Sequence, residues 1–128
     1  MIRKFLKTGL FLAVTMLIFT GCRTAPIYNV SHKTVTPTSY SRMQSAILRA
    51  GNSLGWHMSP VRKGLILGKL ALRSHVAFIN IYYSGRGYSI KYVKSANLKY
   101  NPEKGTIHGN YNGWIQNLER AIDAQLMR

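Results

Sequence analysis

The sequence predicts an α+β protein, a two-layer sandwich in which an N-terminal and a C-terminal helix pack on an antiparallel sheet of about three to four strands. Three observations predict this fold. Apolar residues recur at helical spacing over 43–54 and again over 114–126. Between these segments, residues 56–94 contain short alternating apolar and polar runs. Tight turns such as 84–87 separate the runs, so neighbouring strands are expected to be antiparallel.

The N-terminal 21 residues predict a signal peptide. Residues 1–7 carry three basic residues and no acid, and an apolar run follows over 9–19. This run is shorter than the roughly 20 residues that a membrane span requires. A secreted protein with an incidental cysteine and an uncleaved short anchor remain as alternatives.

The four residues that end at Cys22 read Phe-Thr-Gly-Cys and resemble the bacterial lipobox. In that motif the leader is cut before the cysteine, and the thiol then carries fatty acids such as palmitate. Phe19 replaces the leucine that is usual there. In enterobacterial sorting, Asp directly after the cysteine retains a lipoprotein in the inner membrane. Arg23 occupies that position here, so the resemblance implies the outer membrane, facing the periplasm.

The chain is strongly basic. It has 18 Lys and Arg against three acids, and three of the basic residues lie in 1–21, which leaves a net charge of about +12 on the remainder. This charge predicts an anionic envelope partner: a phospholipid, lipopolysaccharide, peptidoglycan or an acidic protein. A solvated surface tuned for solubility is the alternative. Nucleic acid is not expected after export, and the single Cys22 excludes an intrachain disulfide.

We expect the lipidated cysteine and a flexible tether over 22–38, followed by a single α+β domain over 39–128. Pro26, Pro37 and the many Ser and Thr residues argue against a helix in the tether. A short edge strand is the alternative for part of it. The residues that could form that strand are Ile27, Tyr28 and Val30.

The two helices have recognisable ends. Ser41 fits a capping box at the start of the first helix, and Gly55 fits a left-handed stop after it. The last helix is expected over 111–127, with Asn110 or Asn112 as its N-cap. Its predicted inward face consists of Trp114, Leu118, Ala121, Ile122 and Gln125, with Ile115 and Leu126 on its flank.

Four runs between the helices predict strands: 56–61, 65–73, 75–83 and 88–94. Pro60 indicates that the first of them is an edge strand or ends there. One face of the sheet is expected to be core and to include Ile66, Gly68, Leu70, Leu72, Ala77, Ile79, Ile81 and Tyr83. The other face keeps Phe78, Tyr82 and basic residues. Residues 95–109 are expected to form a long loop.

Few residues offer catalytic chemistry. Glu119 and Asp123 are spaced i, i+4 and are expected to be a solvated pair on the outer face of the last helix. The histidines lie at 32, 57, 75 and 108, without the clustered spacing of metal ligands. We therefore expect no metal, no cofactor and no enzymatic activity.

Aromatic and basic residues interleave between 82 and 100, a composition suited to sugar rings, carboxylates and phosphates. The candidate binding residues are Tyr82, Arg86, Lys91, Lys94, Lys99 and Tyr100. The alternative is that Tyr88 and Tyr92 belong to the core, with their hydroxyls at its rim.

Two further stretches, 88–100 and 107–118, combine with Gly55-Trp56 and with an Arg-x-His-x-Ala pattern at 73–77. Together they resemble a family of small proteobacterial outer-membrane lipoproteins over 41–126, nearly the whole domain. The resemblance implies the anchor and the fold, and no reaction. A ligand role is a hypothesis for His75, His108, Asn110 and Tyr111. The alternative is that such residues tie down the long loop.

The leading hypothesis is an outer-membrane lipoprotein whose basic periplasmic domain binds an anionic envelope component or an acidic protein without catalysis. The first alternative is a structural subunit of an envelope secretion or transport assembly. A cell-wall-acting enzyme is the second alternative, and it would need a cleft with a perturbed acid or histidine.

Overall fold

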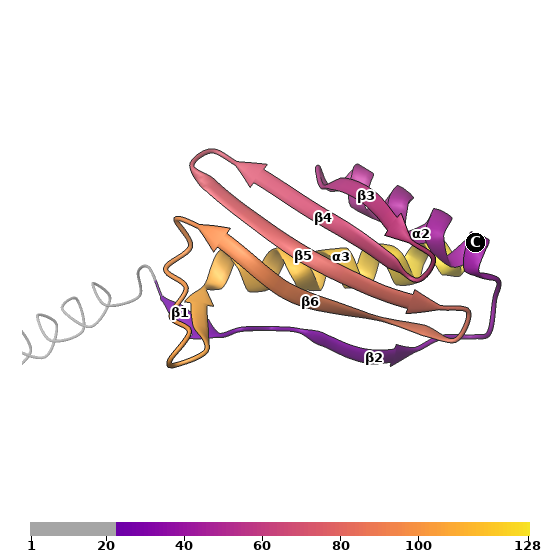
Figure 1. Cartoon of the computed structure of the whole chain (residues 1–128), viewed down its shortest axis with the longest axis horizontal. Coiled ribbons are helices and arrows are strands. Elements are labelled where there is room, and N and C mark those ends of the chain that lie inside the picture. Colours follow the sequence, from indigo (N-terminus) through magenta and orange to yellow (C-terminus); the bar gives the residue numbers. More distant parts are fainter. Residues whose placement is uncertain (1–22) are drawn as a thin grey trace, which may run out of the picture.

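The structure is a computed structural model that describes residues 23–128 (Figure 1). The predicted signal peptide and Cys22 lie outside the described residues. The elements are β1 Thr24–Pro26, β2 Val30–Thr34, α2 Tyr40–Ser53, β3 His57–Arg62, β4 Leu65–Leu72, β5 His75–Ser84, β6 Gly87–Ala96, β7 Thr106–His108 and α3 Gly109–Leu126. No helix among these residues combines the length and the apolar character needed to cross a bilayer.

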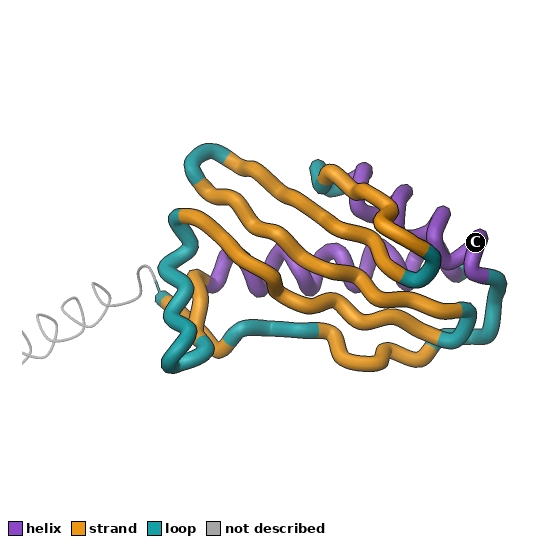
Figure 2. Tube along the Cα trace, viewed as in Figure 1, coloured by secondary structure: helices purple, strands orange, loops and turns teal. Residues whose placement is uncertain are grey.

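The fold is α+β, as predicted, and all strand pairs are antiparallel (Figure 2). The main sheet has five strands in the order β2-β6-β5-β4-β3, and β1 pairs with β7 in a separate two-stranded sheet. The prediction of three to four strands missed β2, which adds the fifth strand beside β6. β3 lies at the opposite edge of the sheet. Pro60 lacks a backbone N–H, but no strand pairs with the outer side of β3, so no strand hydrogen bond is lost there.

Both helices lie behind the five-stranded sheet in the view of Figure 1 and contact each other. Fully buried apolar side chains from the helices and the inner face of the sheet form the core. They include Met43, Ile47, Ile66, Ile79, Ile81, Ile90, Ile115, Leu118 and Ile122. Helix α2 approaches β3 so closely that a Cβ at Gly51 would overlap the Met58 side chain. A glycine inside this helix therefore permits the contact.

The described part of the expected tether, 23–38, is built into the fold. Residues of β1 pair with β7, and β2 pairs with β6. Between these strands, the Tyr28 N–H donates to Asn112 Oδ1 at 2.9 Å. The Ser- and Thr-rich composition that indicated a linker also suits edge strands, which need few apolar residues. Of the residues considered for an edge strand, Val30 lies in β2, whereas Ile27 and Tyr28 lie in the connection between β1 and β2.

Both helices begin at residues other than those predicted. Ser39, not Ser41, caps α2: its Oγ accepts a hydrogen bond from the Arg42 N–H at 3.0 Å. His108, not Asn110 or Asn112, caps α3 in the same way. In each case the preceding residues are held extended by strand or loop hydrogen bonds, so the turn into the helix comes earlier. The predicted stop at Gly55 is confirmed by its φ of 87°.

Two expectations about the strands are corrected. Leu72 is 49% exposed, because β4 ends there, beyond the part of the sheet that the helices cover. The remaining core positions predicted in β4 and β5 are buried. The predicted loop 95–109 is shorter, since β6 continues to Ala96 and Thr106–His108 form β7.

Candidate functional site

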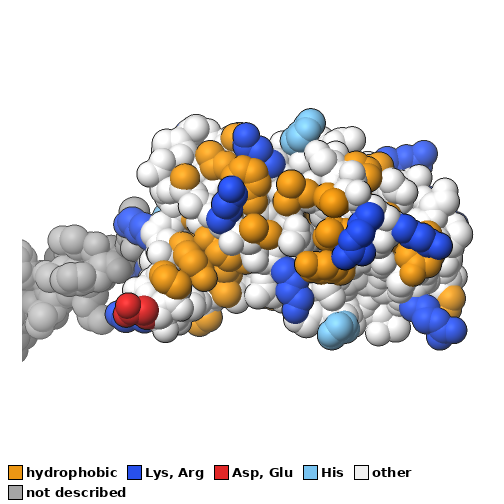
Figure 3. All heavy atoms as spheres, viewed as in Figure 1, with side chains coloured by type: hydrophobic (Ala, Val, Ile, Leu, Met, Phe, Trp, Pro, Cys, Tyr) orange, Lys and Arg blue, Asp and Glu red, His pale blue; other side chains and the backbone are white. Residues whose placement is uncertain are grey.

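The face of the main sheet turned away from the helices presents basic and aromatic side chains. We call it the open face. Figure 3 shows Lys and Arg side chains among hydrophobic ones over this face, with acidic atoms visible at the end near β1. Its residues alternate with the core residues along each strand. They include His57, Ser59, Leu65, Leu67, Lys69, Val76, Phe78, Asn80, Tyr82, Lys91 and Lys94.

A β-bulge in β6 sets the charge of this face. Asn80 of β5 is opposite Lys91 and Phe78 is opposite Lys94, whereas Ile79 is opposite Tyr92. In a regular strand, positions 91 and 94 would point to opposite faces. The bulge leaves Val93 unpaired, and both lysines therefore lie on the open face.

The centre of the open face is a row of four directly paired residues, His57, Lys69, Phe78 and Lys94, which we call the Phe78 row. The ammonium nitrogen of Lys94 lies 4.7 Å from the centre of the Phe78 ring, and that of Lys69 lies 5.6 Å from it. Such contacts contribute roughly 0.5–1 kcal/mol each at exposed sites. They hold two positive charges beside one apolar ring, an arrangement suited to a ligand with both anionic and apolar parts.

None of the five strands contains Asp or Glu, so these lysines have no acidic neighbour within the sheet itself. Two of the three acids are held at the β2 edge in a cluster that we call the α3 clasp. Lys33 Nζ lies 3.0 Å from Glu119 Oε2 and 3.2 Å from Asp123 Oδ2. The hydroxyl of Tyr28 donates to Glu119 at 2.6 Å, and that of Tyr88 donates to Asp123 at 2.7 Å.

The expectation that Glu119 and Asp123 are a solvated outer pair is therefore wrong. The buried face of α3 consists of Tyr111, Ile115, Leu118 and Ile122. This face is rotated from the predicted one, and the rotation turns both acids toward β2. Burial alone would raise the pKa of the Glu119 carboxyl, but the hydrogen bonds from Tyr28 and Lys33 outweigh it and hold the pKa below its usual value.

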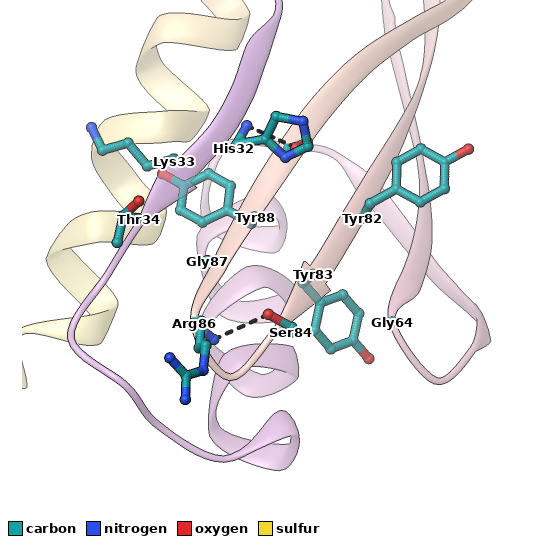
Figure 4. Close-up of a pocket in the computed structure, with 11 residues that line it drawn as sticks. His32, Lys33, Thr34, Gly64, Tyr82, Tyr83, Ser84, Arg86, Gly87 and Tyr88 are labelled. Atoms are coloured by element: carbon teal, nitrogen blue, oxygen red, sulfur yellow. Dashed lines mark hydrogen bonds between the residues drawn. The ribbon is translucent and has the colours of Figure 1, made fainter.

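Two predicted binding residues, Tyr82 and Arg86, line a shallow hollow of about 360 Å³ at the hairpin end of the sheet (Figure 4). His32 lines it from β2, where a positive φ of 53° accompanies an irregularity in the pairing. The His32 N–H donates to Ser89 Oγ at 2.9 Å. The hollow thus extends the open face toward β2 with histidine, tyrosine and arginine side chains.

The other predicted residues lie at the opposite end of the strands or in the core. His75 Nδ1 is 2.7 Å from the Asn97 carbonyl oxygen, and the His75 ring centre lies 6.1 Å from that of His108. Tyr100 packs against Tyr92, with ring centres 4.4 Å apart and the rings tilted by 34°. Lys99, next to Tyr100 in the sequence, and Asn110, two residues after His108, are exposed. His75 therefore holds the loop backbone at Asn97, whereas the His108 N–H donates to the Leu98 carbonyl oxygen at 2.8 Å and the His108 side chain caps α3.

Tyr111 is fully buried, so its assignment as a ligand contact is wrong. Its ring packs edge-on against Tyr92, with ring centres 5.5 Å apart. Tyr88 is also core, as the alternative had it, and Tyr92 is half-buried. Helical spacing alone could have found Tyr111, because it lies four residues before Ile115 on the buried face.

Comparisons with known proteins identify no relative: no protein-family model, curated protein or solved structure matches the chain. The resemblance to small proteobacterial lipoproteins therefore stays a prediction.

Within 23–128, no three His, Cys, Asp or Glu side chains are grouped as metal ligands would be. Lys69 and Phe78 were not among the predicted binding residues, although strand alternation already placed them on the face opposite the core.

Proposed function

We propose that this chain is a lipid-anchored protein of the outer membrane, and that its periplasmic domain binds an anionic envelope component through the open face. The proposal includes cleavage of residues 1–21 and acylation of Cys22. The proposal treats the domain as a two-layer sandwich, in which the helices cover one face of the sheet and the other face is left uncovered.

The single observation that carries the proposal is the Phe78 row. Lys69 and Lys94 flank one aromatic ring on a face whose strands contain no acid. Ammonium groups pair with phosphate or carboxylate, and an aromatic face stacks on sugar rings. Lipopolysaccharide and peptidoglycan both combine anionic groups with sugars, so both are candidate ligands. The held carboxylates of the α3 clasp support binding over acid–base catalysis, since ion-paired acids make poor proton donors.

The test is co-sedimentation of the full chain, in neutral detergent, with isolated peptidoglycan or with immobilised lipopolysaccharide. We expect binding at about 20 mM salt and its loss at about 500 mM, because salt screens exposed charge pairs. K69Q/K94Q removes two charges beside Phe78. At roughly 0.5–1 kcal/mol for each charge contact, affinity should fall about five- to thirty-fold.

The matched control is R49Q/R120Q, which removes two exposed charges from the helices and leaves the open face intact. A nonspecific charge effect would weaken both variants equally and would contradict the proposal. Absence of binding to either material at low salt would also contradict it. A stoichiometric protein captured instead by crosslinking in intact cells would favour the alternative of a structural subunit in an envelope assembly.

A further inference from the structure

The chain enters the fold directly after Cys22. The carbonyl oxygen of Arg23 accepts a hydrogen bond from the Gly109 N–H at 3.2 Å, and Thr24 pairs with His108. One peptide unit, about 3.8 Å between Cα atoms, separates Cys22 from Arg23. A lipid on Cys22 therefore leaves no free chain between the membrane surface and the domain.

The end of the domain at which Arg23 lies also contains the turn after β4 and the loop 97–105 (Figure 1). The Ile27 N–H, just after β1, donates to the Gly105 carbonyl oxygen at 2.9 Å. Asn97 Nδ2 donates to the Ser74 carbonyl oxygen at 2.7 Å, which joins the loop to the turn. These hydrogen bonds make the loop, the turn and the entry of the chain one connected surface, which we call the entry end.

The chemistry of the entry end suits a membrane surface. Arg73, Lys99 and Lys104 are exposed there, and Glu103 is the one acid of the loop 97–105. Tyr100 is 41% exposed and Leu72 is 49% exposed. Clustered basic residues are attracted to anionic lipid headgroups, and tyrosine favours the boundary between headgroups and acyl chains.

We propose that the entry end rests on the anionic phospholipid headgroups of the membrane that holds the Cys22 lipid. This inference rests on the acylation of Cys22 in the proposed function. β5 has ten residues, so it spans about 33 Å from the entry end to the hairpin 84–87. The strands then stand away from the membrane, and the open face is exposed to ligands beyond the headgroups.

The test places a fluorescent label at one of two exposed basic positions of the full, acylated chain. Acylation consumes the Cys22 sulfur, so a cysteine introduced by K104C or R86C is the free thiol that takes the label. Both variants lose one positive charge, and they lie at opposite ends of the strands. The chain is inserted into vesicles of phosphatidylethanolamine and phosphatidylglycerol that contain a headgroup nitroxide lipid as the quencher.

The expected result is quenching about threefold or more greater at position 104 than at position 86, because the positions differ by about 30 Å along the strands. In vesicles of zwitterionic lipid alone, quenching at 104 should fall, and unchanged quenching would overturn the role of the charges. The mass of the intact protein separates the remaining outcomes. Equal quenching at both positions with Cys22 acylated overturns the orientation and leaves the anchor standing. An unmodified Cys22 overturns the anchor and this inference together.

Discussion

Two buried tyrosines differ in what their hydroxyls contact. The Tyr88 hydroxyl donates to Asp123 in the α3 clasp at 2.7 Å. Among the described residues, the Tyr111 hydroxyl has no hydrogen-bond partner. Burial raises the pKa of both phenols, so each remains protonated across the physiological range. A buried hydroxyl without a partner costs free energy, whereas a bonded one contributes it.

Replacement by phenylalanine should therefore act in opposite directions at these positions. We expect Y88F to lower the free energy of unfolding by about 1–2 kcal/mol, through the lost hydrogen bond to Asp123. Y111F should leave it unchanged or raise it by up to about 1 kcal/mol. Urea titration followed by circular dichroism measures both. An equal loss in Y111F would mean that the Tyr111 hydroxyl is satisfied by a buried water.

Glu119 should make the domain less stable in acid. Its pKa in the folded protein lies below the ordinary value of 4.5, so folding favours the carboxylate. The stabilisation is therefore fully present above about pH 5 and is lost as the pH falls through the folded-state pKa. E119Q should show a smaller decline in the free energy of unfolding between about pH 5 and pH 3 than the wild type. E103Q, in the exposed loop, is the control and should keep the wild-type decline.

At the scale of the element, the start of α3 depends on a single side-chain acceptor. His108 Nδ1 accepts a hydrogen bond from the Asn110 N–H at 3.1 Å. H108A should lower the free energy of unfolding by roughly 0.5–2 kcal/mol, and H108N, which restores a capping oxygen, should recover most of it. Thermal denaturation of both variants checks this. If H108N were as unstable as H108A, the contribution of His108 would come from its packing beside His75 and not from the cap.

Element positions could be predicted wherever local pattern decides them. The alternation along β5 predicted the correct core face, and the tight turn predicted at 84–87 joins β5 to β6. The bulge at Val93 could not be predicted in this way, since it appears only when β6 is paired with β5. Because of this bulge, the sequence pattern alone did not place Lys94 beside Lys91.

At the scale of the whole molecule, the strands that the sequence did not predict, β1 and β2, were missed for one reason. β1 pairs with β7 and β2 pairs with β6, so both partners of the N-terminal segment lie far along the chain. Neither strand has the apolar run of a central strand, and their stability comes from partners that local patterns do not reveal. The α3 clasp could not be predicted for the same reason. Lys33 is far from Glu119 and Asp123 in the sequence, and the folded structure brings them together.

The excess of positive charge should make the stability of the whole domain depend on salt. Fifteen Lys and Arg face three acids once residues 1–21 are set aside, and two of those acids already share Lys33. Self-repulsion of this kind destabilises a compact state, and salt screens it over about 10 Å at 0.1 M.

We therefore expect the Tm of the chain in neutral detergent to rise as NaCl increases from about 20 to about 300 mM. A gain of about 1 kcal/mol corresponds to roughly 4–8 °C for a domain of about this size. The opposing effect is screening of the α3 clasp, but it involves one lysine, and the Glu119 side chain is only 15% exposed. K69Q/K94Q, with two charges fewer, should show a smaller rise. A Tm that falls with salt would mean that the clasp contributes more to stability than the repulsion removes.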